Sequence, residues 1–309
     1  MKITTLGTSH GDPTATRYQT STLVETQGRY YLIDAGEPAN AHLVRRGLSA
    51  SRLSAVFITH MHIDHTGSLP VLIEQSTKYR HRHPETHLSV QLPEREAMEP
   101  LLGWVRANCG RADFGDLTVD CYRDRGGYDD GFLRVTPFPT RHVLPREDGS
   151  SRSHSLLVEA EGKRVLFTGD LSSDFSDFPV SAADGCDAVF AELTHYPLEK
   201  AVPVLQTIDP KRLVFYHVHN PYQTPEGEEK VRRLCSVLPY PVEIAYDGFV
   251  LELTGGTEVS RYWMWMMSSR RRMSPKAGVW IMTAFPLRFN VCGRITGRYG
   301  LRSKSCLSS

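Results

Sequence analysis

The sequence has little excess charge, few cysteines and no long apolar run. Its 309 residues carry 36 basic and 35 acidic side chains, so no general attraction to nucleic acid is expected. The six cysteines lie far apart without paired spacing, which favours reduced, mostly buried thiols. No stretch is long enough to cross a bilayer, and the first residues lack the apolar core of a cleavable leader. These absences predict a cytoplasmic protein without a membrane partner.

One short segment concentrates side chains that bind metals. Residues 59–67 read Thr-His-Met-His-Ile-Asp-His-Thr-Gly and directly follow an apolar run. A chain that leaves a buried strand can spread consecutive side chains around one point, so His60 and His62 would share one ion. Asp64 and His65 would turn toward a second. A histidine-rich surface turn is the ordinary alternative, but three histidines with an aspartate are uncommon there.

Four further polar residues stand where predicted strands stop. They are Asp34, His142, Asp170 and His217. Together with the histidine segment they predict an open site at one edge of a sheet core. His219 would face the same side as His217 if that strand continued, so it is the alternative ligand. We favour His217 because it is the first residue beyond the apolar run.

In this order, the motifs resemble those of the metallo-β-lactamase superfamily over about residues 1–253. The resemblance implies an α/β fold, a four-layer αββα sandwich that holds two divalent metal ions. It implies His60, His62 and His142 on the first ion, Asp64, His65 and His217 on the second, and Asp170 as the bridge. Asp34 would accept hydrogen bonds that hold the histidine loop in place. Imidazole and carboxylate ligands suit zinc first, with manganese or iron as alternatives, whereas calcium would need more oxygens.

Within the superfamily, residues 6–14 and 21–25 resemble the ribonuclease Z and phosphodiesterase branch. Residues 190–195, Phe-Ala-Glu-Leu-Thr-His, lie where ribonuclease Z-like proteins carry His-Glu-Ala-Thr. Two features depart from known patterns. Only 27 residues separate His142 from Asp170, which leaves no room for the long arm that grips transfer RNA in ribonuclease Z. True lactamases have cysteine at the bridging position, so a β-lactam substrate is not expected.

The resemblance also implies a mechanism. Two metals that share a water would lower its pKa to about 7 and supply hydroxide for attack on a phosphodiester. Asp64 would help to orient this hydroxide. His195 or His219 would protonate the leaving group, and Glu192 would orient the imidazole. For His195 the alternative is a packed or surface histidine without a catalytic role.

Three functions remain open on the sequence. The first is a phosphodiesterase that acts on a small, cyclic or nucleotide phosphodiester. The second is a hydrolase of a thioester, lactone or other ester on the same metals. The third is a metal-binding interaction protein without catalysis. A nucleic-acid partner is allowed but is not supported by the net charge, and a homodimer is allowed because superfamily members often dimerise, although nothing in the chain marks an interface.

Apolar periodicity predicts the secondary structure. Strands are expected at 1–6, 21–25, 30–34, 55–58, 133–138, 156–160, 164–168, 187–192, 213–217 and 249–253, and helices at 38–46, 67–79, 93–108 and 198–205. The second helix should bury Leu69, Leu72, Ile73 and Ser76, and the third Leu101, Leu102, Trp104 and Val105. His81, His83 and His87 are expected in a solvated loop and not in a third metal site, because no strand end accompanies them.

The composition changes near residue 254. After Thr254 the chain has a single acidic residue, Glu258, and an aromatic run at 263–267 that precedes three arginines. Residues 254–309 are therefore separated from the hydrolase domain as a basic extension. Three interpretations fit this composition: a disordered tail, a small added module, or translated sequence that lies outside the ancestral reading frame. A basic aromatic stretch suits nucleic acid or an acidic membrane surface, but a poorly ordered tail is preferred.

Overall fold

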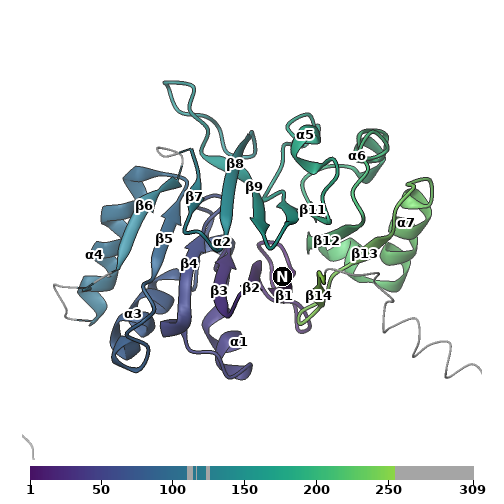
Figure 1. The fold of residues 1–309 in the computed structure, drawn as a ribbon. Helices are drawn as coiled ribbons and strands as arrows, with labels where there is room; N and C mark the ends of the chain where they lie inside the picture. The colour runs from purple at the N-terminus through teal and green to yellow at the C-terminus, as the bar shows by residue number, and fades with distance from the viewer. Residues whose placement is uncertain (110–113, 116, 123–125, 255–309) are drawn as a thin grey trace, which may run out of the picture. The chain divides into compact units, whose positions relative to one another are not determined.

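The computed structural model describes residues 1–109, 114–115, 117–122 and 126–254 (Figure 1). The described residues all belong to one compact unit, Met1–Gly256. Apart from Thr254, the basic extension predicted from the sequence lies outside the described residues. No helix in the described part combines the length and the apolar character that a bilayer crossing requires.

The strands form two seven-stranded sheets, with the orders β14-β1-β2-β3-β4-β5-β6 and β13-β12-β11-β10-β9-β8-β7. The first sheet contains β1 (Lys2–Gly7), β2 (Ser21–Thr26), β3 (Arg29–Ile33), β4 (Leu53–Phe57), β5 (Ser89–Leu92), β6 (Thr118–Cys121) and β14 (Val250–Glu252). The second contains β7 (Tyr128–Asp129), β8 (Arg134–Thr140), β9 (Ser153–Ala160), β10 (Lys163–Phe167), β11 (Ala188–Leu193), β12 (Leu213–Val218) and β13 (Val242–Ile244). The opening antiparallel strands and the β9–β10 hairpin confirm the sequence prediction.

Helices cover the outer face of each sheet. They are α1 (Ala39–Arg45), α3 (Leu69–Tyr79), α4 (Met98–Cys109), α5 (Val180–Ala183), α6 (Leu198–Leu205) and α7 (Pro225–Cys235), whereas the short α2 (Ile63–Thr66) carries part of the histidine segment. One apolar cluster joins α1, α3 and α4 to the first sheet, and another joins α5, α6 and α7 to the second. Figure 1 shows these two groups of helices on opposite sides of the sheets. The predicted four-layer αββα sandwich is confirmed.

The central strands are buried on both faces. In β10, Val165 and Phe167 point into the core between the sheets, whereas Leu166 points toward the helices. In β4, Phe57 points into the core between the sheets, whereas Val56 points toward the helices of the first layer. Because both faces are covered, these strands read as continuous apolar runs instead of alternating ones. This pattern explains why the runs could be recognised in the sequence.

The topology brings several strand ends to one edge. β3 and β4 are parallel neighbours, and so are β10, β11 and β12. Asp34 follows β3 and His60 comes shortly after β4, while Asp170 comes shortly after β10 and His217 is the next-to-last residue of β12. The carboxyl ends of parallel strands meet at the same edge, where ligands commonly bind.

The helix predictions were right for α3 and partly wrong for α4. The predicted face of α3 is buried at all four positions. α4 begins at Met98 and not at residue 93, and Trp104 is 63% exposed, so its predicted inward orientation was wrong. Only Val105 of this helix is fully buried, because α4 covers its cluster with a narrow apolar stripe. None of the four described cysteines is in a disulfide bond, and three of them are buried.

The α3 face provides a stability test. Leu72 is completely buried against the first sheet, whereas its neighbour Val71 is 44% exposed. Leu72→Ala should lower the free energy of unfolding by about 2–5 kcal/mol, because it removes buried methyl groups and leaves a cavity. Val71→Ala should change it by about 0.5 kcal/mol or less. Urea unfolding followed by circular dichroism measures both, and equal losses would contradict the assigned face.

Candidate metal centre

The histidines and acids predicted as ligands converge on one place. Three overlapping groups each have ligand atoms within 4.8 Å of one another. The groups are His60, His62, His142 and Asp170; then Asp64, His65 and His217; and then Asp170, His195 and His217. The first two groups have the division that the sequence predicted, and Asp170 lies beside both.

Local backbone geometry aims these side chains at the centre. His62 precedes α2, a single helical turn that buries Asp64 and His65. A Cβ at Gly36 would lie 2.2 Å from the carbonyl oxygen of Asp64, so only glycine allows this turn to pack closely. Asp34 and His217 have φ values of 57° and 49°, which are unfavourable for residues with side chains and are typical of functional sites.

Asp170 is the common neighbour of the surrounding imidazoles. Its Oδ2 lies 3.5 Å from His60 Nε2, 3.5 Å from His142 Nε2 and 3.4 Å from His217 Nε2, and its Oδ1 lies 3.5 Å from His65 Nε2. Burial alone would raise the pKa of Asp170, but the adjacent His217, His65 and His60 hold it well below its ordinary value. The carboxylate is therefore ionised and can bind a cation through each oxygen.

Three buried atoms at this centre have no hydrogen-bond partner. They are His60 Nε2, His65 Nε2 and Asp170 Oδ1. A buried polar atom without a partner costs about 1–3 kcal/mol, so three together need an explanation. Divalent metal ions supply one, because imidazole nitrogen and carboxylate oxygen are their usual ligands. The residues present therefore fit a metal centre.

Hydrogen bonds on the far side of each ring fix which nitrogen faces the centre. His65 Nδ1 donates to Asp34 Oδ2 at 2.8 Å. The Thr59 hydroxyl donates to Asp34, so its oxygen can accept from His60 Nδ1 at 3.2 Å. With Nδ1 occupied in this way, the lone pair of Nε2 points to the centre, as metal-binding histidines require.

A threonine hydroxyl also orients His217, on the opposite side of the centre. The Thr20 hydroxyl donates to the carbonyl oxygen of Ser9 at 2.9 Å, so its oxygen accepts from His217 Nδ1 at 2.5 Å.

Sequence reasoning missed Thr20 and Thr59, because a threonine hydroxyl carries no motif of its own. The one available signal was the position of Thr59 directly before His60. Asp34 also accepts from the backbone N–H of Thr59 at 2.8 Å.

The charges at the centre favour a cation. Burial lowers the pKa of His60 well below its ordinary value, and the nearby His65 lowers it further. Burial also acts to lower the pKa of His65, but the carboxylates of Asp170 and Asp34 outweigh it and raise that pKa well above the ordinary value. The carboxylates that favour a proton at His65 favour a metal cation for the same reason.

His195 lies beside the centre and is oriented by Glu192. The completely buried Glu192 carboxylate accepts from the backbone N–H groups of Leu171, Thr194 and His195 and from His195 Nδ1 at 3.0 Å. Burial opposes protonation of His195, but Glu192 and Asp170 raise its pKa to about 9. Glu192 and Asp170 therefore favour the imidazolium form of His195, which is the form that a general acid needs.

His219 and the His81–His87 cluster are not brought to the centre. Among the described residues, the three ligand groups include neither His219 nor His81, His83 or His87. The ring of His219 lies 5.1 Å from the ring of His10, and His87 Nε2 contacts the hydroxyl of Thr118 at 2.8 Å. The structure thus places His217, and not His219, at the centre. The sequence had left the two as alternatives.

The centre opens on the side of its first ligand group. Asp64, His65 and His217 are buried, whereas His62 is exposed and the His142 side chain is 12% exposed. The His195 side chain, at 29% exposure, borders the same opening. A substrate would therefore approach across these three rings.

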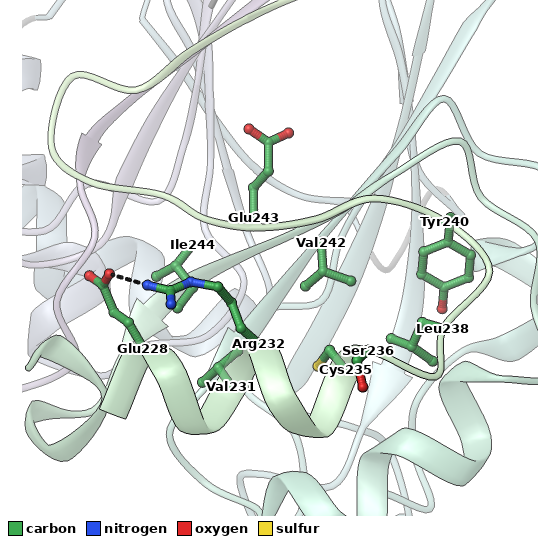
Figure 2. A pocket seen from close by; sticks show the side chains of 10 residues that line it. All are labelled: Glu228, Val231, Arg232, Cys235, Ser236, Leu238, Tyr240, Val242, Glu243 and Ile244. Atoms are coloured by element: carbon green, nitrogen blue, oxygen red, sulfur yellow. Dashed lines mark ion pairs between the residues drawn. The ribbon is translucent and has the colours of Figure 1, made fainter. Parts of the chain in front are cut away.

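A separate pocket lies between α7 and β13. It has a volume of about 490 Å³ and is lined by Val231, Cys235 and Tyr240 among others, with Arg232 paired to Glu228 at its rim (Figure 2). None of the candidate site residues lines it. Burial raises the pKa of the Cys235 thiol to about 11, so this cysteine is not a nucleophile at neutral pH.

Comparison with known proteins agrees with the fold and the ligand pattern. The profile of the Metallo-beta-lactamase superfamily matches residues 15–227, which is more than half of the chain. The chain belongs to this superfamily. A ribonuclease Z from Bradyrhizobium diazoefficiens is 34% identical over 161 residues, which cover 46% of this chain and 52% of the relative. The chain thus spans about half the length of that superfamily relative.

Solved structures show the same superfamily fold over most of this chain. The metallo-beta-lactamase fold protein YhfI from Bacillus subtilis superimposes with a TM-score of 0.65 at 18% identity, and 82% of this chain and 99% of that chain are covered. The short form of human tRNase Z superimposes with a TM-score of 0.61 at 20% identity, and the coverage is 82% and 100%. At these identities the likeness concerns the fold alone.

The hydroxyl of Thr59 offers a test of how the ligands are held. Thr59→Val should weaken zinc binding by about 10- to 100-fold, because Asp34 and His60 lose the group that orients them. Thr5→Val is the matched control, since Thr5 is equally buried but donates to Tyr246 away from the centre. Competition with a chromophoric chelator measures both affinities. Unchanged affinity in Thr59→Val would contradict the proposed orientation of the ligands.

Proposed function

We propose that this protein is a metal-dependent hydrolase that cleaves a small, cyclic or nucleotide phosphodiester with two divalent metal ions. One observation carries the proposal: the Asp170 carboxylate lies 3.4–3.5 Å from imidazoles of both ligand sets, and His60 Nε2, His65 Nε2 and Asp170 Oδ1 are buried without a hydrogen-bond partner. A carboxylate placed between two ligand sets in this way suits a pair of ions.

The ligands divide into two sets. His60, His62 and His142 would hold the first ion and Asp64, His65 and His217 the second, with Asp170 beside both sets. A set rich in imidazole favours zinc, and manganese and iron accept the same ligands. When bound, such a pair supplies hydroxide near neutral pH and offsets the charge that builds on a phosphate during displacement.

The protein side chains would then orient the reactants and move a proton. Asp64 Oδ2 lies 3.5 Å from His65 Nε2 and 3.9 Å from His217 Nε2, at the place where it can also accept a hydrogen bond from the attacking water. His195 gives a proton to the leaving oxygen from Nε2, because Glu192 occupies its Nδ1. Asp34, Thr20 and Thr59 keep the rings from rotating.

The relatives support phosphodiester chemistry, and the chain itself supports a small substrate. A relative and a fold neighbour carry the names ribonuclease Z and tRNase Z, which are names of RNA-cleaving enzymes. Between His142 and Asp170 this chain has only the β8–β9 loop and the β9–β10 hairpin. With a net charge of +1, it has no general excess of positive charge for a long nucleic acid.

A substrate panel tests the reaction class. The zinc- or manganese-loaded protein should hydrolyse bis(4-nitrophenyl) phosphate faster than an aryl ester or a lactone, and a chelator should abolish the activity until metal is returned. His62→Ala should lower the metal content from about two ions per chain to about one and remove most of the turnover. His87→Ala, at a histidine outside the centre, should do neither. Turnover of the ester or lactone alone would reject the phosphodiesterase assignment, and two bound metals without any turnover would favour a binding protein.

The proposed acid has its own test. His195→Ala should lower kcat by about 10²- to 10⁴-fold on an alkyl phosphodiester, whose leaving alkoxide needs a proton. The loss should be much smaller on bis(4-nitrophenyl) phosphate, because nitrophenolate leaves without one. Metal content measured by mass spectrometry should stay at the wild-type value. Equal losses on both substrates would show that His195 acts in another way.

A further inference from the structure

Two apolar side chains stand unusually exposed at the opening of the metal centre. Leu144 is 81% exposed and Ile63 is 73% exposed, which are the highest values among the large apolar side chains of the described residues. Single exposed apolar residues are common on protein surfaces and usually need no explanation. Here the position of the pair, and not exposure alone, suggests a role.

Both residues lie on the segments that carry the exposed ligands. Ile63 directly follows His62 and begins α2, and Leu144 lies on the β8–β9 loop two residues beyond His142. The two segments meet where His62 Nδ1 and His142 Nε2 approach to 3.2 Å. Since His62 and His142 border the open side of the centre, a substrate that reaches the centre passes beside the segments that carry Ile63 and Leu144.

Polar contacts hold each segment in place. The carbonyl oxygen of His62 accepts from the backbone N–H of His65 at 3.1 Å and from the Thr66 hydroxyl at 3.0 Å. On the other loop, the Arg146 guanidinium donates to Glu94 at 2.8 Å. The apolar side chains are thus presented by anchored backbone, so a ligand that covers them loses little free energy to ordering.

The charges of the second loop do not favour another anion at this place. Arg141 donates to Asp174 at 3.1 Å, and Arg146 is paired with Glu94 and Glu96. These two cations are therefore partly neutralised by their own carboxylates. An uncharged apolar group matches the surface beside the opening better than a second phosphate does.

We propose that Ile63 and Leu144 form an apolar rim that contacts an aromatic or other apolar substituent on the phosphorus of the substrate. The proposal rests on the proposed function and names its substrate class: phosphodiesters with at least one such substituent. Covering the two side chains removes apolar surface from water, and this contribution to binding is independent of the reaction at phosphorus.

Binding of phosphonates tests the rim without turnover. Calorimetry with the zinc-loaded full chain should show phenylphosphonate bound about 3- to 10-fold more tightly than methylphosphonate, because only the phenyl ring reaches the rim. Ile63→Thr and Leu144→Asn should each reduce this preference and leave the affinity for methylphosphonate unchanged. Val44→Thr is the matched control, since Val44 is 62% exposed on α1, outside the ligand loops.

Turnover separates failure of the rim from failure of the proposed function. On bis(4-nitrophenyl) phosphate, the two rim variants should raise KM by about 3- to 10-fold at constant kcat and constant metal content. Hydrolysis by the wild type without a phenyl preference in binding would overturn the rim and leave the phosphodiesterase standing. A phenyl preference that the rim variants abolish, in a protein that hydrolyses no phosphodiester, would support the apolar rim and reject the reaction. A preference that survives both substitutions would overturn the rim.

Discussion

The rest of the centre depends on one buried carboxylate among several imidazoles. Asp170 has four histidine Nε2 atoms within 3.5 Å of its oxygens, and it is almost completely shielded from water. Such a concentration of lone pairs in a poorly solvated place is unfavourable unless positive charge occupies it. The hydrogen bonds on the far sides of the rings, the closely packed turn at Gly36 and the unusual backbone of Asp34 all serve to maintain this arrangement.

Many of the residues that form this centre could be predicted from the sequence because of where they stand. A strand buried on both faces leaves a continuous apolar run, and a histidine or aspartate at its end is then conspicuous. Asp34, His60, Asp170 and His217 all have this position. Periodicity also identified α3, whose apolar face is broad.

Other features have no comparable signal. α7 was not predicted, because only Gly227, Val231 and Cys235 of its eleven residues are buried and six of the other eight are charged. Trp104 was assigned inward because large aromatic residues are usually buried, but the stripe of α4 is too narrow to include it. The roles of Thr20 and Thr59 depend on contacts between distant segments, which no local pattern records.

The two sheets contribute to the centre in different ways, and this has a consequence for folding. The first sheet leads to Asp34 and the histidine loop, the second leads to Asp170 and His217, and Thr20 contacts His217 across 197 positions of the chain. Neither half holds a complete ligand set before the sheets have docked. A metal ion bound to ligands from both sheets would therefore stabilise the docked pair and not either sheet alone.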